Sequence, residues 1–204
     1  MCGVVDHLRA VERLKNRYYV MRHGQSKANL AGIIVSRVES DASGDYGLSE
    51  RGREQVLAAA RGCGLPGRTL ICSSDFARAA QTASIMAEQL RSPAVVFTAA
   101  LRERCFGTWD GTSTENYRKV WAADEAGASG DGVEPASAVL DRATAFILEL
   151  ELERQAGRDI LLVSHGDTLQ ILQAGFGRMD PARHRQLPHL ETAEIRRMRL
   201  EAAG

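Results

Sequence analysis

Residues 18–29 of the chain read YYVMRHGQSKAN. The first four residues predict a short buried strand, and Arg22, His23 and Gly24 follow at its carboxyl end, the edge at which ligands of parallel α/β sheets gather. Neutral imidazole is a competent nucleophile toward phosphorus, and the glycine lets backbone approach and offers its amide to oxygen atoms. His23 is therefore a candidate nucleophile, although a lone histidine at a strand end is more commonly structural or a metal ligand.

A second histidine–glycine pair stands after another apolar run. Residues 160–163 predict a buried strand, and Ser164, His165 and Gly166 follow it directly. Two such pairs in one short chain are much harder to explain as structural residues than a single pair. If the two strands are neighbours in the sheet, the two imidazoles meet at one point.

The rest of the chain alternates between short apolar runs and helical patterns. Such alternation predicts an α/β fold, a three-layer αβα sandwich around a mostly parallel central sheet. Residues 192–200 are a candidate edge strand. The other expected elements are strands at 69–72 and 95–97, and helices over 49–61 capped by Ser49, over 75–90 capped by Asp75, over 137–154, and after Asp167.

Three segments fall outside this alternation, and we expect a single domain over residues 1–204 that includes them. The leader, residues 1–17, has apolar residues at helical spacing and predicts a short amphipathic helix. Residues 30–48 and 104–136 read as long loops, which in a compact domain are commonly lids or binding loops over a site. The apolar residues that give the leader its helical spacing are Val5, Leu8, Val11 and Leu14. The apolar residues of the two loops either line a pocket or pack in the interior, and they are Ile33, Ile34, Val35, Phe106, Trp109, Tyr117 and Trp121.

Two further side chains fit phosphate chemistry. Arg78 lies in the helix after the strand at 69–72 and is a natural second guanidinium, since bidentate arginine contacts suit phosphate better than lysine contacts. A departing ester oxygen needs a proton, which a carboxyl held protonated near neutral pH can supply. Glu103 lies close to apolar Leu101 and Phe106, and partial burial raises the pKa of such a carboxyl. An isolated Arg-Glu-Arg segment is more commonly an exposed pair, so only the other motifs favour this role.

The composition argues against several function classes. Lys plus Arg and Asp plus Glu each number 26, so the formal net charge of the 204 residues is zero, and neither a nucleic-acid nor a membrane partner is indicated. The four cysteines form no CxxC spacing and no histidine cluster, so we expect no metal, no cofactor and no disulfide. Reduced thiols, a charged leader and the lack of a long apolar run favour a cytoplasmic protein.

Four motifs in order resemble the histidine phosphatase superfamily, the phosphoglycerate mutase-like group, and within it the phosphatase branch. They are Arg22-His23-Gly24-Gln25-Ser26 with Asn29, then Ser73 with Arg78, Gln81 and Thr82, then Leu101, Glu103, Phe106 and Gly107, then Ser164-His165-Gly166. The resemblance implies a metal-independent phosphatase that hydrolyses a small phosphate monoester through a phosphohistidine.

The same resemblance implies a role for each site residue. His23 becomes phosphorylated, and Glu103 is the general acid and then the base that activates water. Arg22, Arg78 and His165 bind the phosphoryl group and stabilise its transition state. The further residues expected to contact the phosphate or its surroundings are Gly24, Ser26, Asn29, Glu103 and Gly166.

A phosphoglycerate mutase is the runner-up. Cofactor-dependent mutases characteristically carry a long helical insertion between the general acid and the second histidine, whereas Glu103 and His165 are only 62 positions apart. The Leu-Asn-Glu-Arg-His-Tyr-Gly run typical of mutases is also altered at residues 101–107. A phosphoprotein phosphatase and a non-catalytic binder of phosphorylated ligands are further alternatives. The sequence leaves open both the substrate and the oligomeric state, with a homodimer as the commonest closed assembly.

Overall fold

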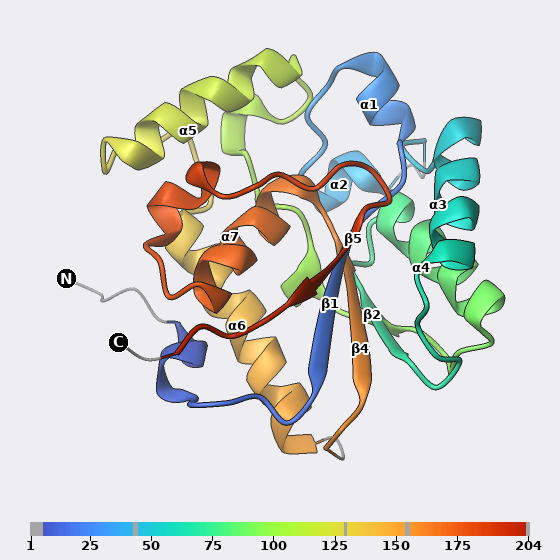
Figure 1. The fold of residues 1–204 in the computed structure, drawn as a ribbon. Helices are drawn as coiled ribbons and strands as arrows, with labels where there is room; N and C mark the ends of the chain where they lie inside the picture. Colours follow the sequence, from blue (N-terminus) through green and yellow to red (C-terminus); the bar gives the residue numbers. More distant parts are fainter. Residues whose placement is uncertain (1–5, 43–44, 129, 154–155, 203–204) are drawn as a thin grey trace.

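A five-stranded sheet forms the centre of the computed structural model, which describes residues 6–42, 45–128, 130–153 and 156–202 (Figure 1). The strand order is β3-β2-β4-β1-β5, with β5 antiparallel to β1 at one edge and every other pair parallel. The mostly parallel sheet and the edge strand are as predicted. The strands are β1 (Arg17–Arg22), β2 (Leu70–Ser73), β3 (Val96–Phe97), β4 (Asp159–Ser164) and β5 (Ile195–Met198).

The two strands that precede the histidines are neighbours at the centre of the sheet. Every residue of β4 is buried, as its continuous apolar run predicts. The parallel register pairs Arg22 with Ser164, so the next residue of each strand, His23 or His165, stands at the same carboxyl edge. The sheet therefore brings the two histidine–glycine pairs together.

Helices cover both faces of the sheet, α3 and α4 on one side and α6 and α7 on the other (Figure 1). Successive strand residues face opposite layers: Leu162 belongs to the core beneath α6 and α7, and Leu161 to the core beneath α3 and α4. The αβα sandwich is thereby confirmed. No helix among the described residues is long and apolar enough to cross a membrane. The four helices are α3 (Glu50–Gly62), α4 (Ala77–Leu90), α6 (Ala136–Glu153) and α7 (Gly166–Phe176).

Local side-chain chemistry explains where these helices begin, with one correction. Ser49 caps α3 by accepting a backbone hydrogen bond from the first turn, as predicted. The prediction that Asp75 caps α4 is wrong, because the helix begins after Phe76. The carboxylate of Asp75 instead accepts two hydrogen bonds from Arg102, at 2.7 and 2.5 Å. A bidentate pair of this kind is charge-assisted and fixes the orientation of the carboxylate.

The leader is not the amphipathic helix that its spacing predicts. Its described part contains a single 3-10 turn, η1 (His7–Ala10), and Val5 lies outside the described residues. Arg178 donates to two backbone carbonyls of this segment, at 3.1 and 2.8 Å, and so occupies acceptors that a continuing helix would use. Leu8 is nevertheless fully buried in the core beneath α6 and α7.

The two predicted loop segments contain short helices and pair with each other at the end of the molecule where β1 and β4 finish (Figure 1). A single bridge joins Ile33 to Ser113, and the carboxylate of Asp110 accepts hydrogen bonds from Ser36. The helix α5, which the sequence does not predict, lies in the second segment. The short helices in and around these segments are α1 (Lys27–Ala31), α2 (Val38–Asp41), η2 (Ala99–Leu101), η3 (Gly107–Trp109), η4 (Thr114–Asn116) and α5 (Tyr117–Glu125), and the tail contains η5 (Pro181–Gln186).

The apolar residues of the two segments form a small core of their own. Ile34, Phe106 and Val120 are buried together, and Trp109 and Tyr117 pack against them. This cluster joins the first segment to the second without involving the sheet. For Ile34 and Phe106 the packing interpretation is therefore the correct one.

Candidate active site

His23 lies at the carboxyl end of β1 with its ring almost fully enclosed, 3% exposed. Its Nδ1 is 2.7 Å from the carbonyl oxygen of Gly24, and because a carbonyl only accepts, Nδ1 carries the hydrogen and Nε2 the lone pair. Arg78 donates from Nε to this Nε2, at 3.2 Å. The ring of His165 lies beside it, with 5.2 Å between the ring centroids. The tautomer thus directs the free lone pair of His23 toward Arg78.

Burial keeps both imidazoles neutral. Desolvation lowers the pKa of His23 well below its ordinary value, and the positive charges of Arg78 and Arg22 lower it further. Desolvation, followed by the charge of Arg78, likewise lowers the pKa of His165. His23 therefore keeps its lone pair at neutral pH.

Two guanidinium groups are held beside the histidines by fixed acceptors. Arg78 donates from Nη2 to the carbonyl oxygen of Val35 at 2.9 Å, and its Nη1 lies 3.5 Å from the carboxylate of Asp41. Arg22 donates from Nη1 to a backbone carbonyl at 3.0 Å and to Nε2 of His189 at 2.7 Å. Nε of Arg22 and Nη1 of Arg78 are buried without a hydrogen-bond partner among the described residues. Both are free to donate to an oxygen of a phosphate.

Ser74 sets the orientation of His165. Its Oγ accepts the backbone N–H of Phe76 at 3.2 Å and lies 2.9 Å from Nε2 of His165. The hydroxyl hydrogen of Ser74 can point at Nε2, in which case His165 carries its own hydrogen on Nδ1. That Nδ1 is buried and has no partner in the described part of the chain. In that tautomer His165 offers one unused donor beside the ring of His23.

Glu103 presents one carboxyl oxygen to the backbone. Its Oε1 accepts the backbone N–H groups of Arg104 at 3.0 Å and of Thr168 at 3.3 Å. Desolvation raises the pKa of Glu103, as the sequence predicts, and the negative charge of Asp167 raises it further, while Arg78 lowers it. Because Oε1 already accepts two hydrogen bonds, a proton on this carboxyl resides on Oε2.

The side chains of Arg22, His23, Arg78 and Glu103 meet in a cavity of about 180 Å³ at the strand ends, whereas His165, beside His23, is not among its lining residues. Gly24 does not line it: its N–H donates to Oγ1 of Thr82 at 3.1 Å, and a Cβ there would lie 2.6 Å from the carbonyl oxygen of Gly52. The amide that the sequence places against phosphate is thus bound to Thr82 of α4, and this glycine permits close packing against α3. The predicted residues that do line the cavity are Arg22, His23, Ser26, Asn29, Arg78, Glu103 and Gly166.

Part of the cavity wall consists of Tyr117 and Trp121, which the sequence leaves either lining a pocket or packed against the core, and of residues outside the predicted site. Tyr117 and Trp121 of α5 stack with 5.4 Å between centroids and 9° between planes, and Cζ of Arg185 lies 3.7 Å from the centre of the Trp121 ring. Asp167 and His189 also line this wall. The sequence could have indicated the aromatic pair and Asp167 as site residues, because the pair stands in a predicted loop segment and Asp167 directly follows the Ser164-His165-Gly166 motif. Arg185 and His189 could not have been indicated in this way, since they lie beyond the last motif and reach the site through η5 and the tail.

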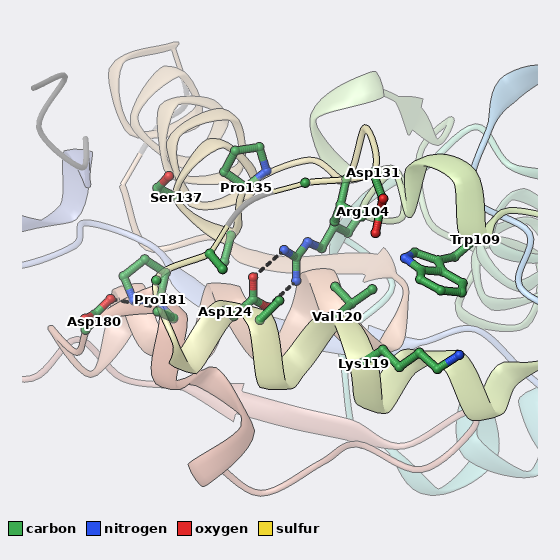
Figure 2. Close-up of a pocket in the computed structure, with 17 residues that line it drawn as sticks. Arg104, Trp109, Lys119, Val120, Asp124, Asp131, Pro135, Ser137, Asp180 and Pro181 are labelled. Atoms are coloured by element: carbon green, nitrogen blue, oxygen red, sulfur yellow. Dashed lines mark hydrogen bonds and ion pairs between the residues drawn. The ribbon is translucent and has the colours of Figure 1, made fainter.

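A larger cavity, about 410 Å³, opens on another face of α5 (Figure 2). The side chain of Arg104 lies within it and donates two hydrogen bonds to the carboxylate of Asp124, at 2.6 and 2.7 Å. Its described lining residues include no histidine and none at a strand end, so the smaller cavity is the candidate active site. Nowhere in the described ranges do three or more His, Cys, Asp or Glu side chains gather in a way that could hold a metal ion.

Comparisons with known proteins point in one direction. A family model for the histidine phosphatase superfamily (branch 1) matches residues 18–204. The chain is 31% identical over 173 residues to a glucosyl-3-phosphoglycerate phosphatase of Mycolicibacterium vanbaalenii, covering 78% of this chain and 73% of that one. It is 28% identical over 171 residues to a metal-independent phosphoserine phosphatase of Arabidopsis thaliana, covering 79% and 69%. A native structure of a mycobacterial glucosyl-3-phosphoglycerate phosphatase matches with a TM-score of 0.75 at 28% identity, covering 89% of this chain and 88% of that one.

Proposed function

This chain belongs to the histidine phosphatase superfamily, and we propose that His23 is the nucleophile of its reaction. The protein is a metal-independent phosphatase that hydrolyses small phosphate monoesters through a phosphohistidine. The observation that carries the assignment of His23 is its tautomer: Nδ1–H is bound to the Gly24 carbonyl, so Nε2 presents a lone pair inside a buried, positively charged cavity.

The first half of the reaction transfers the phosphoryl group to His23. The lone pair of Nε2 forms the bond to phosphorus, the bond from phosphorus to the ester oxygen breaks, and the departing oxygen takes the proton from Oε2 of Glu103. Arg78 now donates to Nε2 itself, so substrate must replace that contact with one from Arg78 to a phosphoryl oxygen. Nε of Arg22 and Nδ1 of His165 are the other donors that would stabilise the charge of the transition state.

The second half regenerates the enzyme. The Glu103 carboxylate takes a proton from water, the water oxygen bonds to phosphorus, and the bond to Nε2 breaks with its electrons returning to His23. The rate is then expected to be bell-shaped in pH and to favour mildly acidic to neutral solution. It falls in acid as His23, whose pKa is lowered, becomes protonated, and it falls in alkali as Glu103, whose pKa is raised, loses its proton. A rate that rises steadily to alkaline pH contradicts these roles.

The substrate of the proposed reaction is a phosphate ester that also carries a carboxylate. Arg22 and Arg78 are sufficient for the phosphate, yet Arg185 adds a third guanidinium to the same small cavity, stacked on Trp121. The two relatives are named for their action on glucosyl-3-phosphoglycerate and on phosphoserine. In both compounds the phosphate is esterified to a hydroxyl group, and the molecule also carries a carboxylate. In this proposal residues 104–136 form the cap of a single domain and hold Trp121 and Arg185 where the non-phosphate end of the substrate lies.

The test of the activity is phosphate release from a panel of monoesters in the presence of a chelator. Phosphoserine, 3-phosphoglycerate and 4-nitrophenyl phosphate are the informative members, since the last has no carboxylate. Turnover in chelator, with a phosphoryl group recovered on a peptide that contains His23, is the expected result. An enzyme that turns over its substrate without labelling His23 contradicts the mechanism.

Arg185→Gln tests the substrate class separately. We expect KM for phosphoserine and 3-phosphoglycerate to rise roughly 10- to 100-fold, because a hydrogen bond between charged groups contributes roughly 1.5–3 kcal/mol, while KM for 4-nitrophenyl phosphate stays near that of the wild type. Arg183→Gln is the matched control, since Arg183 is an exposed residue of the same η5 and does not line the cavity. An equal rise in KM for all three esters argues against binding of a substrate carboxylate by Arg185 and leaves the phosphatase mechanism unaffected.

A further inference from the structure

Asp167 is a buried carboxylate at the active site to which the reaction described above gives no role. It is the second residue of α7, it is 5% exposed, and it lines the same cavity as His23 and Glu103. Its Oδ1 accepts Nε1–H of Trp121 at 2.9 Å and lies 3.0 Å from Nε2 of His184. Both oxygens are engaged, since Oδ2 is the acceptor of a further bond from the cap.

That further bond belongs to a reciprocal pair between two adjacent segments. Arg104 donates from Nη1 to Oδ2 of Asp167 at 3.3 Å, and Thr168 donates its backbone N–H to Oε1 of Glu103 at 3.3 Å. Each segment therefore contributes one acid and one donor to the other. The hydroxyl of Thr168 also lies 3.2 Å from Oε1 of Glu103. This arrangement fixes the position of Glu103 relative to Asp167.

Positive partners surround Asp167. The guanidinium of Arg104 is 1% exposed and is shared between Asp167 and Asp124; Figure 2 shows its contact with Asp124. The ring of His184 is fully buried, and its nitrogens lie 2.8 Å from the carbonyl of Pro181 and 3.0 Å from Asp167. Because both of these partners only accept, the ring donates to at least one of them. The carboxylate of Asp167 is thus held among fixed donors.

These partners determine the charge of Asp167. Burial by itself raises the pKa of this carboxyl, but the hydrogen bond and charge of His184, together with the charge of Arg104, lower it to about 2. Asp167 is consequently ionised throughout the pH range in which the enzyme would act. Its negative charge is the second largest cause, after burial, of the raised pKa of Glu103. The other groups whose charge or hydrogen bonds reach Glu103 are Arg22 of β1, Arg78 of α4, Tyr117 of α5 and, at its backbone carbonyl, Arg142 of α6.

We propose that Asp167 is a positioning residue for the general acid, a fixed negative charge that keeps Glu103 in its proton-donating form and ties α5 of the cap to the end of β4. The inference rests on the proposed role of Glu103. One side chain then serves both purposes, because Arg104 and Trp121, two of the three side chains that hold the charge of Asp167, come from the cap, while His184 comes from η5. The same contacts therefore hold the cap over the site and keep Glu103 protonated.

The experiment is the pH dependence of kcat for phosphoserine or 3-phosphoglycerate, whichever the wild type turns over faster. In Asp167→Asn the alkaline limb is expected to move to lower pH by about one unit, because removal of a nearby like charge lowers the pKa of a carboxylic acid. Asp124→Asn is the matched control: it removes the other acid bound to Arg104 but leaves the charge of Asp167, so its alkaline limb stays where it is in the wild type. An unmoved limb in Asp167→Asn overturns the inference.

Two precautions separate this result from loss of structure and from failure of the mechanism. The new amide of Asp167→Asn can present an N–H to Arg104, so Asp167→Ser, which is neutral and smaller, is measured as well, and thermal unfolding reports whether each variant is folded. The same shift in both folded variants supports the inference. A wild type whose kcat has no alkaline limb overturns the proposed role of Glu103 itself, whereas a limb that is present and does not respond overturns only the role of Asp167.

Discussion

The carboxyl edge of the sheet and the cap above it are held in place by different means. At the edge, the register of β1 on β4 places His23 beside His165 through a continuous ladder of backbone hydrogen bonds. In the cap, residues 104–136, position depends on single buried side chains such as Arg104 and on the conformation of Gly107. In the proposed mechanism the edge carries the phosphate chemistry, and the cap, held by individual contacts, faces the rest of the substrate. Substitutions at the edge should change the rate, and substitutions in the cap should change binding and stability.

The largest effect is expected for His23→Ala at the sheet edge. Without Nε2 no phosphoenzyme forms, and kcat should fall by on the order of 10⁴-fold or more, while circular dichroism and the melting temperature show a folded protein. His7→Ala is the control, because His7 lies in the leader and contacts Asp141 rather than the cavity. Substantial turnover by a folded His23→Ala protein removes the basis for a covalent mechanism at this position.

Glu103→Gln, in the segment between η2 and the cap, should have a smaller and more selective effect. Glutamine keeps an oxygen that can accept the backbone hydrogen bonds of Arg104 and Thr168 but has no proton to donate. We expect kcat for phosphoserine to fall about 10²- to 10⁴-fold, the usual contribution of general acid–base catalysis. With 4-nitrophenyl phosphate, whose leaving group needs no proton, rapid mixing should show a burst of one nitrophenolate per enzyme and then slow turnover. A loss without any burst contradicts the assignment of Glu103 as acid and base.

Gly107→Ala in the cap should leave kcat nearly unchanged but lower the stability of the cap and weaken substrate binding. Gly107 has φ +57°, and a Cβ there would lie 2.0 Å from the carbonyl oxygen of Asp131. We expect the free energy of unfolding to fall by about 1–3 kcal/mol and KM to rise more than kcat falls. Gly111→Ala is the matched control, because Gly111 has φ +77° but open space around its Cβ, so only the backbone cost of about 1 kcal/mol applies. Equal losses in the two variants would show that the contact with Asp131 is unimportant.

The sequence predicts the residues at the sheet edge well, because short patterns of neighbouring residues are enough to place them. A run of apolar residues followed by Arg22 and His23, and another followed by His165, is enough to place these side chains at the carboxyl ends of two buried strands. The burial of Glu103 also follows from its apolar neighbours. The capping role given to Asp75 failed, because its bidentate partner Arg102 stands 27 positions away and short-range patterns do not report such contacts.

The cap and the tail show where prediction from sequence ends. Arg104 reads as one member of an exposed Arg-Glu-Arg run, yet its side chain is 1% exposed, since Asp124 and Asp167 neutralise it inside the protein. Arg185 belongs to a tail without motifs and enters the cavity because η5 folds back against α7 and α5. No local pattern distinguishes these arginines from solvated ones.

The sequence alone therefore determined the αβα fold, the pair of histidines and the class of reaction, because hydrophobic periodicity and short motifs act over a few residues of chain. Only the tertiary structure decided the tautomer of His23, the two hydrogen bonds that leave Oε2 of Glu103 to carry the proton, and the placement of Asp167 among Arg104, Trp121 and His184. These depend on burial and on partners distant in the sequence, and desolvation with fixed charges is what sets the protonation of a buried group.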